Sequence, residues 1–313
     1  MRPARPDPRT SDPAAPAGPP AVKPGLVLAV ALVGISFAAP LVRLSDAHPL
    51  AISIWRLAFS LVVIGVALIA GGGWRQWTRL DRPSLAIALG AGALLAVHFW
   101  AWNASIGMTS IAASVVLVNL HPVVVAAVSA VWLGERPTPR QWVGIVLALA
   151  GAVVIATGDV GGANAGTSAR ALLGDVLAVV GAVTVALYYV GGRRLRQTLD
   201  LWPYVGLVYG SCLLVLLGFA TALGVPFATQ PPRELAIFAA LALGPMLLGH
   251  TGMNYALRYL PAYVVALTVL GEPVGATLLG AFLPGIREVP GPRTLVGAVI
   301  ILAGVVATAR TKR

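Results

Sequence analysis

Long apolar segments recur along the whole of this chain of 313 residues. An α-helix of about 18 or more apolar residues is long enough to cross a hydrocarbon core roughly 30 Å thick. A transmembrane barrel would instead show segments of about ten residues with alternating polarity. The sequence therefore predicts an all-α membrane protein with ten spans, near 25–43, 50–71, 84–106, 110–133, 140–157, 171–191, 203–224, 234–256, 261–284 and 293–309.

Composition supports a membrane protein rather than a soluble one. The chain is 58% hydrophobic and 11% charged, whereas soluble domains average about 45–50% apolar and about 25% charged. The net charge of +11 could suggest nucleic-acid binding, but most Lys and Arg lie in short loops between spans, where they set topology. We therefore expect no nucleic-acid partner. The single cysteine, Cys212, excludes a disulfide framework and a cysteine-based metal site.

The basic residues also predict the orientation. Segments that are inside when the N-terminus is cytoplasmic hold Arg75, Arg79, Arg82, Arg136, Arg140, Arg193, Arg194, Arg196 and Arg258, together with the basic residues of both tails. The outside segments hold fewer: Arg43, Arg170, Arg233, Arg287 and Arg293. Both termini are therefore expected to be cytoplasmic. Residues 1–23, rich in Pro, Ala and Arg, are predicted to be a disordered cytoplasmic tail, and 310–313 a basic one.

An internal repeat relates the two halves of the chain. The stretch "NLHPVVVAAVSAVWLG" (119–134) lies over "LGEPVGATLLGAFLPG" (270–285), and "RQWVGIVLALAGAVV" (140–154) lies over "RTLVGAVIILAGVVA" (293–307). Gly144 thereby pairs with Gly297, and Gly151 with Gly304. Because each half has an odd number of spans, the second half crosses in the opposite sense, an arrangement common among secondary transporters. The predicted units are two inverted five-helix repeats, 24–157 and 171–309, with an external linker at 158–170.

Three stretches carry a resemblance to a known family. "GERPTPRQWVGIVLALAGAVVI" closes the first half, "GDVLAVVGAVTVALYYV" opens the second, and "LGEPVGATLLG" lies near its end. Over roughly 25–309 the chain resembles an EamA-type transporter of the drug/metabolite transporter superfamily. The resemblance implies ten helices in two five-helix repeats and the movement of small metabolites, often outward, across the bacterial inner membrane. One departure is "LPGIREVP", which lacks the "LGE" turn that the first half keeps in "WLGERP".

A carboxylate and a histidine occupy equivalent positions near mid-depth. Glu272 is followed by Pro273, and its repeat partner His121 is followed by Pro122. Each proline frees a backbone carbonyl and kinks its helix, which a membrane tolerates where a neighbour or a wet cavity satisfies the carbonyl. Glu272 and His121 are therefore predicted to bind substrate and to be candidates for proton coupling, since burial favours the neutral carboxyl. The alternative is a protonated Glu272 that fixes helix packing.

Further polar residues in the spans extend the predicted substrate site. His98 and Trp102 are four residues apart on one helix face, and Asn103 recurs as Asn254, four residues after His250. Aromatic surfaces with hydrogen-bonding groups suit an amphipathic or zwitterionic metabolite. The competing interpretation is that Trp102 belongs to an interfacial aromatic belt and that the two asparagines tie helices together.

Shallower or smaller residues are expected to have structural roles. Arg56 lies a turn or two from the outer end of its span and can snorkel, and Asp175 is similarly shallow. Each could line an outer vestibule, and the two could pair. Tyr188 and Tyr189 are expected to be belt residues. Gly271 and Gly275 let a neighbouring helix approach closely.

The sequence therefore predicts a secondary carrier that exports small organic metabolites such as amino acids. Motifs for ATP binding are absent, so the energy is expected to come from gradients. No cofactor is expected, and the expected partners are the substrate, the bilayer and protons. Alternatives remain open: a metal or cationic-drug transporter, a membrane-embedded enzyme, or a scaffold without transport. The histidines lack the close spacing of a metal site, and the clustered carboxylates of a magnesium-dependent enzyme are absent.

Overall fold

The computed structural model describes residues 19–309 except 110–113, 115–116, 159–168 and 283–291. Its regular structure is helical throughout this part of the chain, which confirms the all-α prediction. The helices are α1 (Pro24–Ser36), α2 (Ala38–Leu44), α3 (Pro49–Gly71), η1 (Gly73–Arg79), α4 (Arg82–Ile106), α6 (His121–Trp132), α7 (Pro139–Gly158), α8 (Ala169–Leu195), α9 (Leu201–Ala222), α10 (Pro232–Leu241), η2 (Ala242–His250), α11 (Thr251–Ala256), α12 (Ala262–Val269), α13 (Glu272–Phe282) and α14 (Pro292–Ala309).

The chain is a multi-pass membrane protein by the length and composition of its helices. Within the described residues, six helical segments are long and apolar enough to cross a membrane, namely Pro24–Leu44, Pro49–Gly71, Arg82–Ile106, Ala169–Leu195, Leu201–Ala222 and Pro232–Ala256. Shorter apolar helices are His121–Trp132, Ala262–Ala276 and Leu295–Ala307. The predicted tails up to residue 18 and beyond 309, most of the linker, and the whole "LPGIREVP" loop (283–290) lie outside the described ranges.

Helix starts follow from proline and from side-chain caps. Proline stands in the first turn of α1, α3, α4, α6 and α10, where its missing N–H would have no intrahelical partner. The Asp81 side chain accepts a hydrogen bond from the Ser84 amide at 3.0 Å and caps α4. These signals set the boundaries of helices whose surface is apolar on most sides.

The predicted proline kinks are helix ends in the structure. The span predicted at 261–284 is two helices, α12 and α13, separated at Leu270 and Gly271. The amides of Leu270 and Gly271 bond to carbonyls three residues earlier, which tightens the last turn of α12 before α13 begins at Glu272. In the first half, α6 likewise begins at His121, directly before Pro122. Because proline is favoured in a first turn, each one starts a helix instead of bending one.

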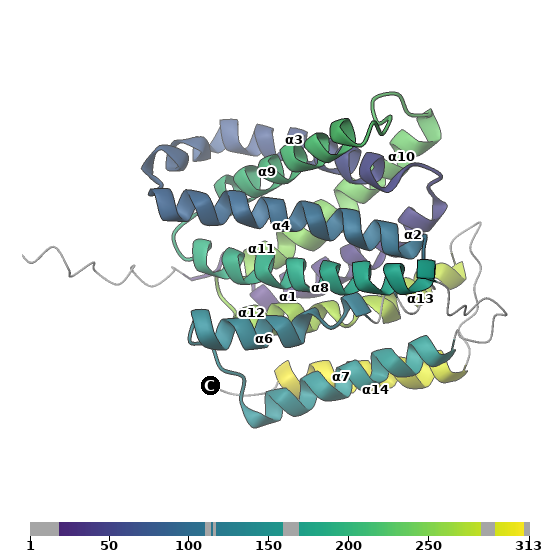
Figure 1. The fold of residues 1–313 in the computed structure, drawn as a ribbon. Helices are drawn as coiled ribbons and strands as arrows, with labels where there is room; N and C mark the ends of the chain where they lie inside the picture. The colour runs from purple at the N-terminus through teal and green to yellow at the C-terminus, as the bar shows by residue number, and fades with distance from the viewer. Residues whose placement is uncertain (1–18, 110–113, 115–116, 159–168, 283–291, 310–313) are drawn as a thin grey trace, which may run out of the picture.

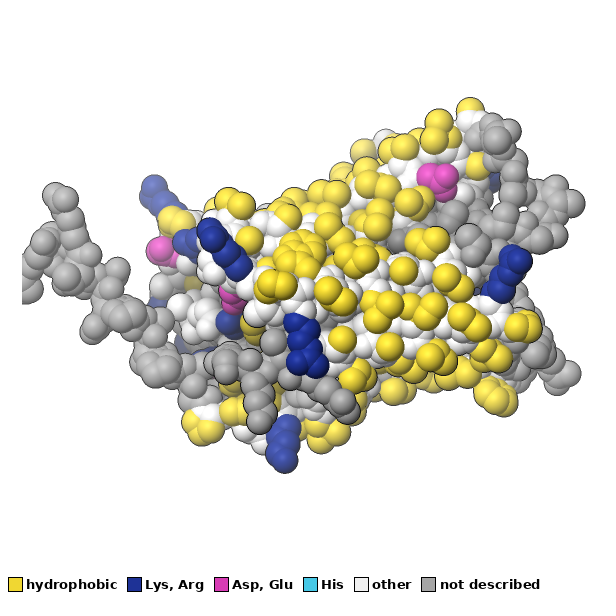
Figure 2. Space-filling model, turned by 90° about the horizontal axis from the view of Figure 1, so that it is seen from below, with side chains coloured by type: hydrophobic (Ala, Val, Ile, Leu, Met, Phe, Trp, Pro, Cys, Tyr) yellow, Lys and Arg dark blue, Asp and Glu magenta, His cyan; other side chains and the backbone are white. Residues whose placement is uncertain are grey.

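Helices distant in the sequence pack side by side. α7 lies along α14, α4 along α8, α3 along α9, and α1 along η2 and α11 (Figure 1). The space-filling view in Figure 2 shows hydrophobic side chains over most of the middle of one face, with Lys and Arg gathered mainly toward one end. An apolar middle with charged ends is the surface that a bilayer requires.

Candidate functional site

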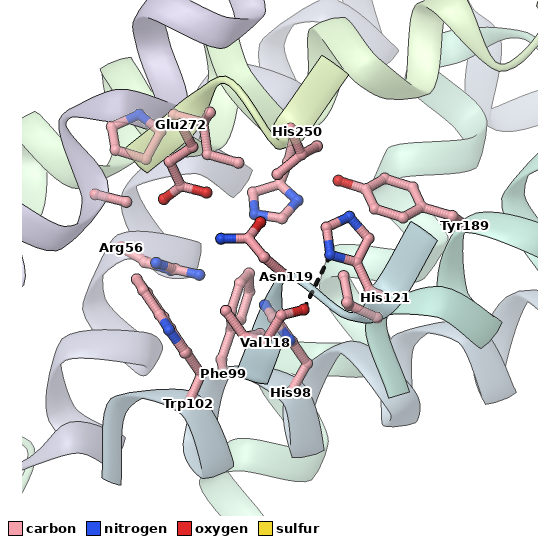
Figure 3. Close-up of a pocket in the computed structure, with 15 residues that line it drawn as sticks. Arg56, His98, Phe99, Trp102, Val118, Asn119, His121, Tyr189, His250 and Glu272 are labelled. Carbon is pink, nitrogen blue, oxygen red and sulfur yellow. Dashed lines mark hydrogen bonds between the residues drawn. The ribbon is translucent and has the colours of Figure 1, made fainter. Parts of the chain in front are cut away.

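A cavity opens among helices from both halves of the chain. Its empty space of about 570 Å³ includes the part that is open to solvent. Its polar and aromatic lining residues are Arg56, His98, Phe99, Trp102, Asn119, His121, Tyr189, His250 and Glu272. Figure 3 shows that their polar ends point toward a common space.

Three predicted histidines meet at this cavity. His98 donates from Nδ1 to the Gly181 carbonyl of α8, 2.9 Å away, since a carbonyl can only accept. His121 Nδ1 donates in the same way to the Val118 carbonyl at 3.0 Å, which Figure 3 marks. That carbonyl is the one that Pro122 frees, so the histidine beside the proline satisfies it. Nε2 of His121 and Nδ1 of His250 are buried without a hydrogen-bond partner in the described part of the chain.

Glu272 stands at the beginning of α13 and lines the cavity from the second half. Its side chain is half-buried, and it takes part in none of the ion pairs among the described residues. His121, its predicted repeat partner, stands at the beginning of α6 and lines the same cavity. A helix N-terminus carries partial positive charge, which favours a carboxylate at this position.

The π-helical segment η2 also reaches the cavity, through Pro245 and His250. Pro245 lies inside this segment and lacks the amide that an α-helical bond would need. The wider turn is a usual way to absorb such a defect, and π-segments are frequent at functional sites. It brings His250 to within 5.4 Å of Phe99, measured between ring centroids, with the two rings edge to face.

Arg56 is the main lining residue that sequence reasoning placed elsewhere. It does not snorkel to the surface: its side chain is 1% exposed, and its guanidinium carbon lies 3.5 Å from the centroid of the Phe99 ring. Asp175 forms no ion pair with Arg56 among the described residues. The Asp175 carboxylate instead accepts a hydrogen bond from Thr109 at 2.7 Å. One signal in the sequence could have identified Arg56. Its helix neighbours at three and four residues are Ile52, Ser53, Phe59 and Ser60, none of which can neutralise it.

Two predicted site residues lie outside the cavity lining and tie helices together. Asn103 donates to Ser53 Oγ at 3.0 Å, joining α4 to α3. Asn254 donates to the His250 carbonyl at 2.8 Å and to the hydroxyl of Tyr188. The structure therefore gives both asparagines packing contacts. Tyr188 joins this buried network, whereas Tyr189, which was expected to lie in an interfacial belt, lines the cavity.

The two glycines beside Glu272 bring α1 close to α13. A Cβ at Gly271 would stand 2.8 Å from a methyl carbon of Leu32, and one at Gly275 would overlap Ser36. The contact at Gly275 leaves no room for a side chain, whereas the one at Gly271 is with the flexible end of Leu32. They hold α1 against the helix that presents Glu272.

Polar contacts join the two halves at one end of the bundle. Arg193 at the end of α8 bonds through Nε to Glu135 Oε1 at 2.6 Å and through Nη1 to the Leu257 carbonyl at 2.8 Å. The second oxygen of Glu135 accepts from the Ala262 amide at 3.1 Å. Nearby, a hydrogen bond from Gln76 and the charge of Arg258 hold the pKa of Asp200 below its ordinary value, against an opposing effect of burial.

The opposite end is joined by a second network. Glu234 at the start of α10 accepts a hydrogen bond of 2.5 Å from Ser45. Arg233 contacts Asp46 at 3.0 Å and the Leu44 carbonyl at 2.7 Å. The cavity thus lies between two sets of contacts that cross from one half to the other. The described residues hold no cluster of three or more His, Cys, Asp or Glu side chains suited to a metal ion.

Comparisons with known proteins agree with this architecture. The EamA-like transporter family model matches residues 24–157 and 172–310. A protein of Streptantibioticus cattleyicolor named "Probable terminal-alkyne amino-acid exporter" is 30% identical over 289 residues, which is 90% of each chain. An "Uncharacterized transporter" of Archaeoglobus fulgidus is 32% identical over 130 residues, and this match spans 45% of that protein.

A solved crystal structure shares the fold. It superposes with a TM-score of 0.75 at 20% identity and covers 91% of this chain and 95% of its own. The family match extends over both halves that contribute to the cavity, and the family is one of transporters rather than enzymes. This chain therefore belongs to the EamA-like transporter family.

Proposed function

We propose that the protein is a secondary carrier that exports small organic metabolites such as amino acids, by alternating access around the cavity described above. The observation that carries this proposal is the cavity itself. It is lined from both halves, and it combines one guanidinium, one carboxylate, three imidazoles and aromatic rings. Such a mixture binds the charged end of a small molecule while leaving apolar surface for the rest.

We further propose that the two five-helix halves, 24–157 and 171–309, are related by a pseudo-twofold axis, so that each half supplies one wall of the cavity. The helix pair α7 and α14 supports this relation. A Cβ at Gly151 would contact the Gly297 carbonyl, and one at Gly304 would contact the Gly144 carbonyl. The sequence repeat exchanges Gly144 with Gly297 and Gly151 with Gly304, so it maps each contact onto the other. Reciprocal contacts of this kind are expected between copies related by a twofold axis.

Alternating access requires that one end of the cavity opens while the other stays closed. The contacts between Glu135 and Arg193 at one end, and between Glu234 and Ser45 at the other, join the two halves. We place the Arg193 end in the cytoplasm of a bacterial cell, at the inner membrane, because the arginines gather mainly there (Figure 2).

Glu272 and His121 are proposed to couple transport to protons. Both stand at helix beginnings beside a proline, and both line the cavity from opposite halves. A carboxyl at such a site exchanges its proton as water and substrate enter and leave. A cationic drug is the weaker candidate, because the Arg56 guanidinium would repel it.

Counterflow in proteoliposomes tests the proposal. Purified protein is reconstituted with a mixture of unlabelled proteinogenic L-amino acids inside, and each radiolabelled amino acid is added outside with and without a pH gradient. The expected result is protein-dependent accumulation of at least one label, which the gradient changes. No flux of any amino acid above that of empty liposomes would contradict the proposal.

A further inference from the structure

We propose that Arg56 and Trp102 form a carboxylate-binding subsite within the cavity, so that the transported molecule carries a carboxylate group. This inference rests on the transport function proposed above and specifies the class of its substrate. Arg56 is the one Lys or Arg among the described residues that line the cavity, although its position in the sequence predicted a place near the outer end of its helix.

The unpartnered atoms of Arg56 define the geometry of the subsite. Its Nε and Nη2 are both buried and have no hydrogen-bond partner among the described residues. These two nitrogens form one edge of the planar guanidinium, and their N–H bonds run parallel. That edge matches the two oxygens of a carboxylate in a bidentate pair.

Phe99 holds this edge in place. The guanidinium carbon stacks over the Phe99 ring at 3.5 Å from its centroid, within the range of a cation–π contact. Stacking fixes the plane of the guanidinium and leaves its edges free to bond. The ring itself is 1% exposed and is held against His250, so the support is rigid.

No direct ion pair neutralises this charge among the described residues. None of the ion pairs in the described part of the chain includes Arg56. Glu272 lines the same cavity and acts on Arg56 through its charge, but the two form no ion pair. Buried arginines are normally paired. Arg196, elsewhere in the protein, is a buried arginine whose donors have partners. It is 2% exposed and donates to the Asn254 carbonyl at 3.0 Å and to the Leu199 carbonyl.

Trp102 adds a third unpartnered donor. Its indole Nε1 is buried without a hydrogen-bond partner in the same lining. Trp102 stands three residues after Phe99 on α4, where the two side chains share a face, and its ring is stacked parallel to His98. Figure 3 draws Trp102 and Arg56 on the same side of the cavity. An oxygen held by Arg56 can thus accept from the indole as well.

The rest of the lining suits the other end of a zwitterion. The Glu272 carboxylate lines the cavity as an acceptor. Nδ1 of His250 is buried there without a hydrogen-bond partner among the described residues. Donors on one side and acceptors on the other fit a molecule with both a carboxylate and an ammonium group, as an α-amino acid has.

The test compares ligands that differ only in the carboxylate. Proteinogenic L-amino acids, their α-carboxamides and the corresponding decarboxylated amines are measured by thermal shift on the purified protein and as inhibitors of counterflow. We expect at least one amino acid to bind, and its carboxamide and amine to bind at least about tenfold more weakly, because they leave the Arg56 edge unpaired.

Variants connect this preference to the subsite. Arg56→Lys keeps the charge without the bidentate edge and is expected to lower affinity for the acid about tenfold or more. Trp102→Phe keeps an aromatic ring without the N–H and should lower it less, about three- to tenfold. Arg196→Lys is the matched control: it perturbs a buried arginine whose bonds are internal, and the acid-to-amide ratio should stay unchanged.

The outcomes separate this inference from the function on which it rests. Equal binding of acids, amides and amines to the wild type, or an unchanged ratio in Arg56→Lys, would overturn the subsite even if counterflow succeeds. Binding that depends on Arg56 without any flux would keep the subsite and overturn the carrier. If no carboxylate in the panel binds, the subsite is wrong. Wild-type ligand comparisons decide the question even if a variant does not fold.

Discussion

Gly151 on α7 lies in backbone contact with Gly297 on α14, since a Cβ at position 151 would stand 2.7 Å from the Gly297 carbonyl oxygen. Membrane helices gain stability from such close approach, because lipid supplies no hydrophobic force between them. The contact joins the last helix of one half to the last helix of the other.

Gly151→Ala is therefore expected to push α7 from α14 and lower stability by about 1–3 kcal/mol, as overpacking does. Thermal unfolding in detergent measures the change. Gly90→Ala is the control, because nothing lies within 4 Å of a Cβ at Gly90 on α4, and it should be neutral or slightly stabilising. An equal Tm for the two variants would show that the α7–α14 contact is not tight.

Glu272→Gln preserves the shape of the side chain and removes its charge and its exchangeable proton. If Glu272 couples transport to protons, net flux driven by a pH gradient should fall at least about tenfold, and the remaining flux should not depend on pH. Flux is measured in proteoliposomes at several pH values. Asp81→Asn, at an exposed helix cap where asparagine serves equally well, should leave the profile intact. Undiminished, still pH-dependent flux in Glu272→Gln would rule out this role.

Glu135→Gln should loosen the proposed cytoplasmic end. The Glu135–Arg193 contact is charge-assisted and its side chains are each 17% exposed, so its loss should cost about 1.5–3 kcal/mol of the closed state. A cysteine at Val185, which lines the cavity, should then react several-fold faster with an impermeant maleimide in inside-out vesicles. The single native cysteine, Cys212, is buried and gives little background. Unchanged labelling would show that this contact does not hold the end shut.

Asn254→Leu tests whether the repeated asparagines serve packing. Asn254 is fully buried and bonds to His250 and Tyr188, so the variant should lose about 1–3 kcal/mol of stability by leaving partners unsatisfied. Relative affinities across a ligand panel should stay the same. Selective loss of one ligand at unchanged Tm would instead support the substrate contact that the sequence suggested.

Asp200 predicts a pH dependence at the loop before α9. Its pKa is lowered in the folded state by Gln76 and Arg258, so its stabilising effect is complete above the unfolded pKa near 3.9 and is lost as pH falls through the folded value. Asp200→Asn should lower stability slightly at pH 7, by at most about 1 kcal/mol, because the Asp200 side chain is 61% exposed and solvent screens the pair. The difference should shrink as the pH falls below about 4. A gap that widens in acid would show that this ion pair is not stabilising.

The polar residues of the spans were good guides to the cavity. His98, Trp102, His121, His250 and Glu272 were selected from the sequence, and the structure brings all five to one space. Their cost in lipid explains this success, because an isolated polar group in a span must face a cavity or a partner. Asn103 and Asn254 do not line the cavity, and their side-chain amides bond to partners in the protein instead.

The sequence by itself determined that the chain is helical and membrane-spanning, and it predicted kinks at Pro122 and Pro273, where the structure has helix starts. These properties depend on local chemistry: apolar length, proline and caps. Only the tertiary structure decided which side of each helix faces the protein interior. A span that is apolar on most sides has no polar face in its sequence that would indicate this rotation. That rotation buries Arg56 over Phe99 instead of sending it to the surface, and turns Asn103 toward Ser53 and away from the cavity.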